Sequence, residues 1–131
     1  MTEAALRAVM EAEPQLNIAG LGSRKLPEQT PEEYETSVSR LKAELADSVE
    51  SFEKVCAWLS GLERSDINTT RSSYGWKHVA EQRLGSYVAN GVLIAAAIHC
   101  KIPYRRIPDT PNAYLGISEA SAQGQPPEQV S

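Results

Sequence analysis

The sequence predicts a mainly α-helical fold, in which a long amphipathic helix packs on two short central helices and a small C-terminal β-hairpin follows. Three observations support this expectation. An apolar stripe of helical period extends over residues 34–62, the run VLIAAAI at 92–98 is apolar on every side, and residues 108–112 are dense in turn formers. The chain has 131 residues, which is enough for one domain with a real core.

We divide the chain into a short N-terminal helix with a linker (1–29), a helical core domain with the hairpin (30–118) and a disordered tail (119–131). In the first part, Leu6, Val9 and Met10 share one helical face, and Pro14 ends the helix. Residues 15–29 have no consistent period and are expected to be a linker. The tail has no apolar cluster and two consecutive prolines, which predicts disorder.

Residues 30–33, Thr-Pro-Glu-Glu, are the clearest local signal, since they combine an N-cap, a proline at the first helical position and a capping box. No breaker follows until Gly61, so one helix about 45 Å long is expected. Its apolar residues recur in alternating steps of four and three, except at Ser48. This stripe predicts either packing within the chain or a coiled-coil seam between two chains. The predicted partner interface, and the surface of a possible homodimer, is Tyr34, Val38, Leu41 and Leu45.

Residues 63–71 are polar and rich in capping residues, so we expect a loop there. The first central helix begins at Ser72 or Ser73 and ends near Gly85. Its apolar face consists of Trp76, Val79, Ala80 and Leu84.

The second central helix, over VLIAAAI, has no polar face and is expected to be buried, with Asn90 as its cap and Pro103 beyond its end. It is far shorter than the ~20 apolar residues of a membrane span, so no membrane partner is predicted.

The hairpin is expected to pair a strand around 102–107 with a returning strand around 114–117. Pro103 and Pro108 favour an edge position for the first strand, because proline has no amide to donate to a neighbouring strand.

Charge is divided unevenly along the chain, whose net charge is −4. Residues 61–107 carry seven basic and three acidic residues, a net +4, and the remainder carries −8. A basic core is typical of proteins that bind phosphate-bearing partners, although the same cations also suit a solvated surface or pairing with the acidic flanks. The predicted nucleic-acid-binding residues are Arg71, Lys77, His78, Arg83, Lys101, Arg105 and Arg106.

His78 is the strongest candidate for chemistry, since Tyr74 and Glu81 lie four residues before it and three after it on one helical face. No nucleophile-elbow motif accompanies it, so we expect a polar surface histidine, no catalytic residue and no enzyme.

The cysteines and histidines match no zinc-binding spacing, and neither a metal site nor a cofactor is predicted. Cys56 and Cys100 are interpreted as buried free thiols of a reducing cytoplasm, with a disulfide as the alternative.

The segments SSYGWKHVAE, YVANGVLIAAAI and PNAYLGIS resemble a family of small uncharacterised proteins of bacterial phages, plasmids and integrated elements. The resemblance covers about residues 66–118 and rests on the pattern SYG-x-KH-x-x-E, then Y-V-x-N-G, then an alanine-rich run. It implies a bacterial cytoplasmic protein, and it brings no catalytic residues with it.

The sequence therefore predicts a non-enzymatic accessory protein of a mobile genetic element that acts by binding. Its basic core is expected to touch nucleic acid or a nucleic-acid-bound complex. Sequence-specific reading of the major groove is disfavoured, because the helix VLIAAAI cannot face water. The alternative is a protein-interaction or inhibitor module that binds a host protein through the long helix.

Overall fold

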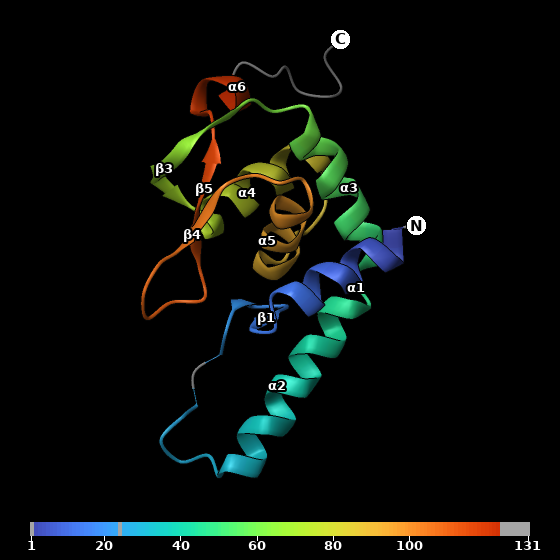
Figure 1. The fold of residues 1–131 in the computed structure, drawn as a ribbon, viewed down its shortest axis with the longest axis vertical. Helices are drawn as coiled ribbons and strands as arrows, with labels where there is room; N and C mark the ends of the chain where they lie inside the picture. The colour runs from blue at the N-terminus through green and yellow to red at the C-terminus, as the bar shows by residue number, and fades with distance from the viewer. Residues whose placement is uncertain (1, 24, 124–131) are drawn as a thin grey trace.

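A buried helix, α5 (Asn90–His99), forms the centre of the fold. The computed structural model describes residues 2–23 and 25–123. Residues 92–97 are all buried, as their apolar character predicts. The helices α1 (Thr2–Ala12), α3 (Val49–Ser60) and α4 (Ser73–Leu84) pack against α5, which lies in the middle of the body in Figure 1.

The N-terminal helix α1 lies across the junction between α3 and α2 (Pro31–Ala46) (Figure 1). Leu6 and Val9 are buried, and Met10 packs half-buried against the same core. This is the face that the helical spacing predicts.

The single long helix predicted from residue 31 to residue 60 is wrong, because α2 ends at Ala46 and α3 begins at Val49. The interruption is centred on Ser48, whose amide donates to the carbonyl oxygen of Leu45 (2.9 Å). In a continuous helix the Ser48 backbone amide would donate to the carbonyl oxygen of Glu44. Here the Ser48 hydroxyl donates to that oxygen instead (2.8 Å). The break therefore falls at the residue where the apolar stripe is interrupted.

The start of α2 confirms the predicted capping box. Thr30 accepts a hydrogen bond from the Glu33 amide (3.1 Å), and the Glu33 carboxylate accepts one from the Thr30 amide (2.8 Å). The helix then runs from the bottom of Figure 1 up towards the body.

The linker predicted for residues 15–29 contains a small antiparallel hairpin of β1 (Leu16–Asn17) and β2 (Gly20–Leu21). Leu16 and Leu21 face each other in register and are both buried. The side chain of Asn17 closes the turn by accepting a hydrogen bond from the Ala19 amide (2.7 Å). The segment is thus part of the core, not a connection outside it.

This hairpin docks on the start of α5. The Gly91 amide donates to the carbonyl oxygen of Ile18 (3.0 Å), which satisfies one of the free amides of the helix N-terminus. A Cβ atom at Gly91 would lie 1.8 Å from the carbonyl oxygen of Asn17, so only glycine permits this close approach.

The fold class predicted from the sequence, a mainly helical body with a small C-terminal hairpin, is wrong. The strands β4 (Tyr104–Arg106) and β5 (Ala113–Ile117) pair antiparallel, but they belong to a larger sheet. That sheet is three-stranded and antiparallel, in the order β3-β5-β4, and its third strand is β3 (Arg64–Ser72). The molecule therefore combines helices with two antiparallel sheets.

The strand β3 comes from the polar segment that the sequence predicts to be a loop. Ile67 is its sole apolar residue, so β3 shows no alternation of buried and exposed side chains. Its extended form comes from pairing with the buried strand β5, with irregular register on both sides of Asn68. The side-chain amide of Asn68 also donates to the carbonyl oxygen of Ile117 (3.1 Å). Tertiary pairing has decided the conformation here.

The helix α4 begins and ends where its capping residues predict. Ser72 accepts a hydrogen bond from the Gly75 amide (3.4 Å), and Gly85 ends the helix with a left-handed φ of 70°. Ser73 is buried, and its hydroxyl accepts a hydrogen bond from the Ala113 amide (3.0 Å). This bond joins α4 to the central strand of the sheet.

The tail predicted to be disordered from residue 119 onwards begins with a short helix, α6 (Glu119–Gln123). Glu119 pairs with Arg71 at 2.9 Å, and Ala122 is buried against the core. The prediction is therefore wrong for residues 119–123, and residues 124–131 lie outside the described part of the chain.

We expect the substitution Ile94→Asp to abolish folding. Ile94 is 0% exposed, so the carboxylate would be buried without a partner at a cost of several kcal/mol. The matched control is Ala57→Asp on the exposed face of α3, which is expected to leave a cooperative transition. Thermal unfolding followed by circular dichroism measures both variants, and a normal transition for Ile94→Asp would contradict the central position of α5.

Candidate functional site

A hollow of about 760 Å³ lies where α4, the start of α5 and two turns meet. We call it the tyrosine pocket, and it is lined by Ile18, Ala19, Tyr74, Lys77, His78, Glu81, Tyr87, Asn90, Pro111 and Asn112. Apart from Ser73, the polar residues of the patterns SYG-x-KH-x-x-E and Y-V-x-N-G line this hollow.

One face of α4 supplies most of the polar lining. Tyr74, Lys77, His78 and Glu81 follow one another at steps of three, one and three, which places them along one side of the helix. The shared face predicted for Tyr74, His78 and Glu81 is confirmed, since the carboxylate and the tyrosine ring both contact the histidine.

Glu81 is the centre of the hydrogen-bond network in this pocket. Its Oε2 accepts hydrogen bonds from the Val88 amide and from Lys77 Nζ, both at 3.0 Å. Its Oε1 lies 3.0 Å from Nδ1 of His78. The Val88 amide, followed by Lys77, lowers the pKa of Glu81 from 4.5 to about 2. The carboxylate is therefore held ionised, which makes it a structural anion and not a proton donor near neutral pH.

Lys77 is buried between this carboxylate and two tyrosine rings. Its side chain is 7% exposed, and Nζ lies 4.8 Å from the centroid of the Tyr87 ring and 5.4 Å from that of Tyr74. Such distances permit cation–π attraction to both rings. The ammonium thus lies against two exposed aromatic rings, and it has little surface left for a phosphate.

The imidazole of His78 is oriented by two neighbours. Because Glu81 is ionised, a proton is assigned to Nδ1, which donates to Oε1 of the carboxylate; Nε2 is an acceptor when the imidazole is neutral. The Tyr74 ring meets the imidazole edge-on, with centroids 4.8 Å apart and planes at 90°. Among the residues that the structure describes, no hydroxyl or thiol group bonds to this histidine, so the His78–Glu81 pair lacks an internal nucleophile.

Asn90 joins three separate segments at the floor of the pocket. Its amide nitrogen donates to the carbonyl oxygen of Ala19 and to Oδ1 of Asn112, both at 2.9 Å. The sequence predicts Asn90 to be a helix cap, but Ala89 holds that position and the Asn90 side chain bonds outside its own helix. This role depends on residues 71 and 22 positions away, so no local signal could have revealed it.

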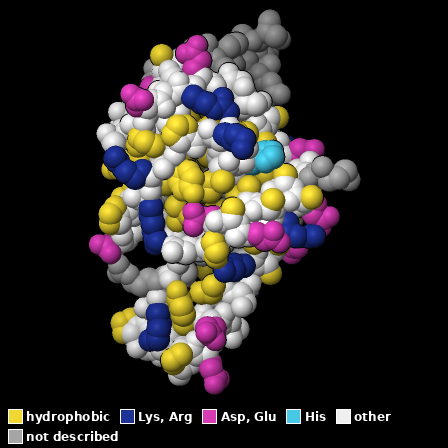
Figure 2. Space-filling model, viewed as in Figure 1, with side chains coloured by type: hydrophobic (Ala, Val, Ile, Leu, Met, Phe, Trp, Pro, Cys, Tyr) yellow, Lys and Arg dark blue, Asp and Glu magenta, His cyan; other side chains and the backbone are white. Residues whose placement is uncertain are grey.

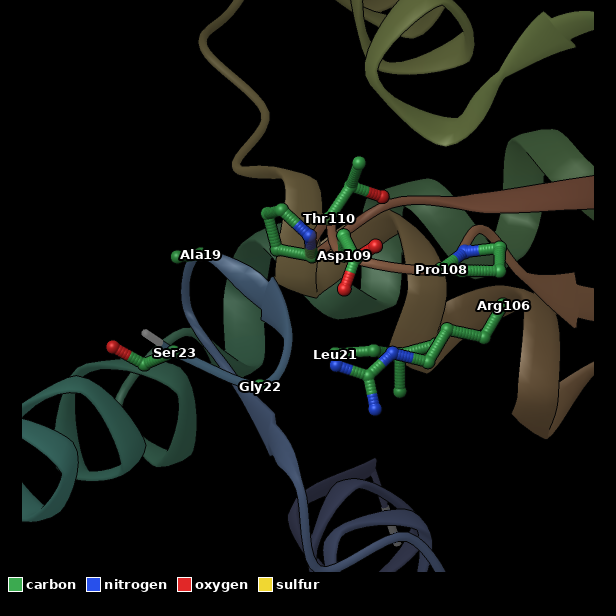
Figure 3. A pocket seen from close by; sticks show the side chains of 9 residues that line it. Ala19, Leu21, Gly22, Ser23, Arg106, Pro108, Asp109 and Thr110 are labelled. Carbon is green, nitrogen blue, oxygen red and sulfur yellow. The ribbon is translucent and has the colours of Figure 1, made fainter. Parts of the chain in front are cut away.

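A second hollow of about 720 Å³ adjoins the tyrosine pocket and shares Ala19 and Pro111 with it (Figure 3). Arg106 extends from β4 towards Leu21 and Gly22, and its guanidinium donates to the side chain of Gln15. Asp109 lies on another side of the same hollow, so this space holds one charge of each sign.

Two further cations of the predicted nucleic-acid-binding set are engaged with the C-terminal segment. Arg71 forms two hydrogen bonds with the Glu119 carboxylate (2.9 and 3.1 Å), and these lower the pKa of Glu119. Arg83 donates to the carbonyl oxygen of Ala122 (3.2 Å). Both side chains therefore hold α6 in place, and Arg71 makes the pairing with the acidic flanks that the sequence left open.

The remaining cations of that set, Lys101, Arg105 and Arg106, are exposed. Arg105 and Arg106 are neighbours in β4, so their side chains leave opposite faces of the sheet. Figure 2 shows lysine and arginine side chains scattered over the visible face among apolar and acidic ones. Lysine and arginine side chains therefore form no single basic patch on this face.

The predicted partner interface on α2 is largely turned towards its own chain. Leu45 is fully buried, and Tyr34, Val38 and Leu41 are half-buried. The Tyr34 hydroxyl donates to the carbonyl oxygen of Ser23 (2.6 Å). The Ile18 amide donates to the carbonyl oxygen of Leu41 (3.2 Å). A homodimer through this stripe stays a prediction, which sedimentation at micromolar concentrations tests.

The chain matches no protein-family model, and comparisons with curated proteins and with solved structures give no match. No helix within residues 2–23 and 25–123 is long and apolar enough to cross a membrane. The same described residues contain no cluster of three or more side chains suited to hold a metal ion. A function has to be inferred from the pocket itself.

We expect acid to destabilise the protein through Glu81. A carboxyl group whose pKa falls from 4.5 in the unfolded chain to about 2 in the folded one stabilises the fold above pH 4.5, and this contribution is lost as the pH falls towards 2. Glu81→Gln should therefore lower the melting temperature at pH 7 and flatten its dependence on pH between 5 and 2. Glu50→Gln, at an exposed position of α3, serves as the control. Equal slopes for Glu81→Gln and the unsubstituted protein would contradict this role.

Proposed function

We propose that the protein acts by binding single-stranded nucleic acid, without catalysis, and that the tyrosine pocket receives an unstacked base. The observation that carries this proposal is the pair of exposed tyrosines on either side of one buried lysine. Tyr87 is 74% exposed and Tyr74 is 53% exposed, whereas Leu26 is the other exposed large apolar residue among those that the structure describes. Aromatic rings kept at the surface in fixed positions are the usual platforms for base stacking.

The chemistry around the rings suits a nucleobase. Asn112 places its side-chain amide at the floor of the pocket, held there by a hydrogen bond from Asn90, and amides recognise the polar edges of bases. Nε2 of His78 adds an acceptor beside the Tyr74 ring. A planar ligand with polar edges can therefore stack on a ring and form hydrogen bonds in the same hollow.

Phosphate contacts are assigned to the exposed cations. Arg106 lines the hollow that adjoins the tyrosine pocket, so a strand that leaves the pocket on this side meets a guanidinium. The carboxylate of Asp109 lines the same hollow and repels a phosphate, and the net charge of the whole chain is −4. Binding is consequently expected to be weak, of low sequence preference and sensitive to salt.

A single strand fits these features better than a duplex. The helix that a winged helix-turn-helix would place in the major groove corresponds to α5, and α5 is buried. An unstacked base can enter a hollow, whereas a paired base within a duplex cannot. A role as an accessory protein of a mobile genetic element is part of this proposal and is supported by the sequence resemblance alone.

Two alternatives have less support. An enzyme based on His78 would need a substrate that brings its own nucleophile, since no described hydroxyl or thiol bonds to this histidine. A module that binds a host protein through α2 would have to use the other side of the helix, since its apolar stripe faces residues 16–23.

We expect Tyr87→Ala to weaken binding to single-stranded oligonucleotides roughly tenfold at low salt, because stacking contributes about 1–3 kcal/mol per base. Fluorescence anisotropy with labelled single-stranded DNA, RNA and duplex DNA measures this effect. Leu26→Ala, at the other exposed apolar position, is the matched control and should leave the affinity unchanged.

The same titrations test the phosphate contact. Arg106→Ala should weaken binding to all sequences alike and reduce the slope of log affinity against log salt by about one. Lys54→Ala, on an exposed part of α3, controls for loss of one positive charge. Absence of binding to any oligonucleotide at tens of micromolar protein would exclude the proposed function.

A further inference from the structure

The two cysteines of the chain meet, although they lie 44 positions apart in the sequence. Cys56 is in the middle of α3, and Cys100 is the residue that ends α5. Sγ of Cys100 lies 3.7 Å from the carbonyl oxygen of Cys56. Neither cysteine lines the tyrosine pocket.

The surroundings hold both sulfur atoms in place without sealing them from solvent. Phe52, one turn before Cys56 on α3, packs against the ring of His99 with centroids 5.7 Å apart. The guanidinium of Arg64 donates to the carbonyl oxygen of Cys100 and so anchors its backbone. Both cysteines are half-buried, so a small reagent can reach the pair.

We propose that Cys56 and Cys100 are a modification site, a dithiol that closes into an intramolecular disulfide when it meets a small disulfide oxidant such as oxidised glutathione. Closure needs the two sulfur atoms to come within about 2.05 Å of each other, and the Cys100 thiol already reaches the backbone of Cys56 at 3.7 Å.

The reaction balances by thiol–disulfide exchange. One cysteine thiolate attacks a sulfur of oxidised glutathione, its S–S bond breaks, and one glutathione leaves as a thiolate. The second cysteine then attacks the protein sulfur of the mixed disulfide and displaces the glutathione bound to it. Two cysteine thiols are oxidised, one oxidised glutathione is reduced to two glutathiones, and the protons lost by the cysteines end on the glutathione thiolates.

The environment of the thiols affects both attacks. Burial, followed by the neighbouring Cys100, raises the pKa of Cys56 to about 12. Cys56 therefore provides little thiolate while the dithiol is intact. Once one cysteine carries glutathione, the other lies beside it and attacks with the advantage of proximity.

The disulfide would join α3 to the end of the buried helix α5. It closes a loop of the chain between residues 56 and 100, which restricts the unfolded state and should raise the melting temperature by roughly 5–10 °C. The tyrosine pocket is at the opposite end of α5, where Asn90 lies, so oligonucleotide binding should not change on oxidation.

The test uses the native full chain, incubated with oxidised glutathione at pH 8 and then acid-quenched. Intact-mass measurement should show loss of two hydrogen atoms from the monomer, with a peptide that links Cys56 to Cys100 after digestion. Dithiothreitol should reverse both the mass change and the rise in melting temperature.

Cys56→Ser and Cys100→Ala are the matched controls, since each removes one partner. Under the same conditions neither variant should lose two hydrogen atoms or gain melting temperature, and Cys56→Ser should accumulate the glutathione adduct on Cys100. The proposal is overturned if the native protein stops at glutathione adducts, forms only intermolecular dimers, or does not react while folded. These outcomes are independent of whether the protein binds nucleic acid.

Discussion

Burial of α5 is the constraint on which the rest of the structure depends. A helix that is apolar on every side has to be surrounded, and here the chain before it and the chain after it both contribute. α1, α3, α4 and the β1–β2 hairpin all contact it. Small side chains at 95–97 allow these neighbours to approach closely. The arrangement leaves the ends of α5 as the places where polar groups from distant segments converge.

The two ends of α5 differ in chemistry for this reason. At its start, Asn90 and Gly91 bond to the turn of the β1–β2 hairpin, and the tyrosine pocket opens beside them. At its end, Cys100 contacts Cys56 and receives a hydrogen bond from Arg64. The helix thus separates a polar hollow suited to a ligand from a thiol pair suited to redox chemistry.

Electrostatics within the chain explain why part of the basic core does not make a basic surface. Glu81 neutralises Lys77 where the two are largely buried, and Glu119 neutralises Arg71. A cation in such a pair contributes to the fold and has little capacity left for a phosphate. What remains for a ligand is the aromatic surface that Lys77 supports, together with exposed cations such as Arg106.

The sequence by itself determined the features that depend on neighbours three or four residues apart. These are the capping box at Thr30, the ends of α4, the burial of α5 and the shared face of His78 and Glu81. Tertiary structure alone decided the strand β3 and the bonds of Asn90, because their partners lie tens of residues away and leave no local period. The hairpin at 16–21 pairs locally, but its backbone also bonds to Leu41, Gly91 and Pro111, which no local pattern reveals. It also decided which cations are free, since the sequence shows charges but not the carboxylates that reach them in space.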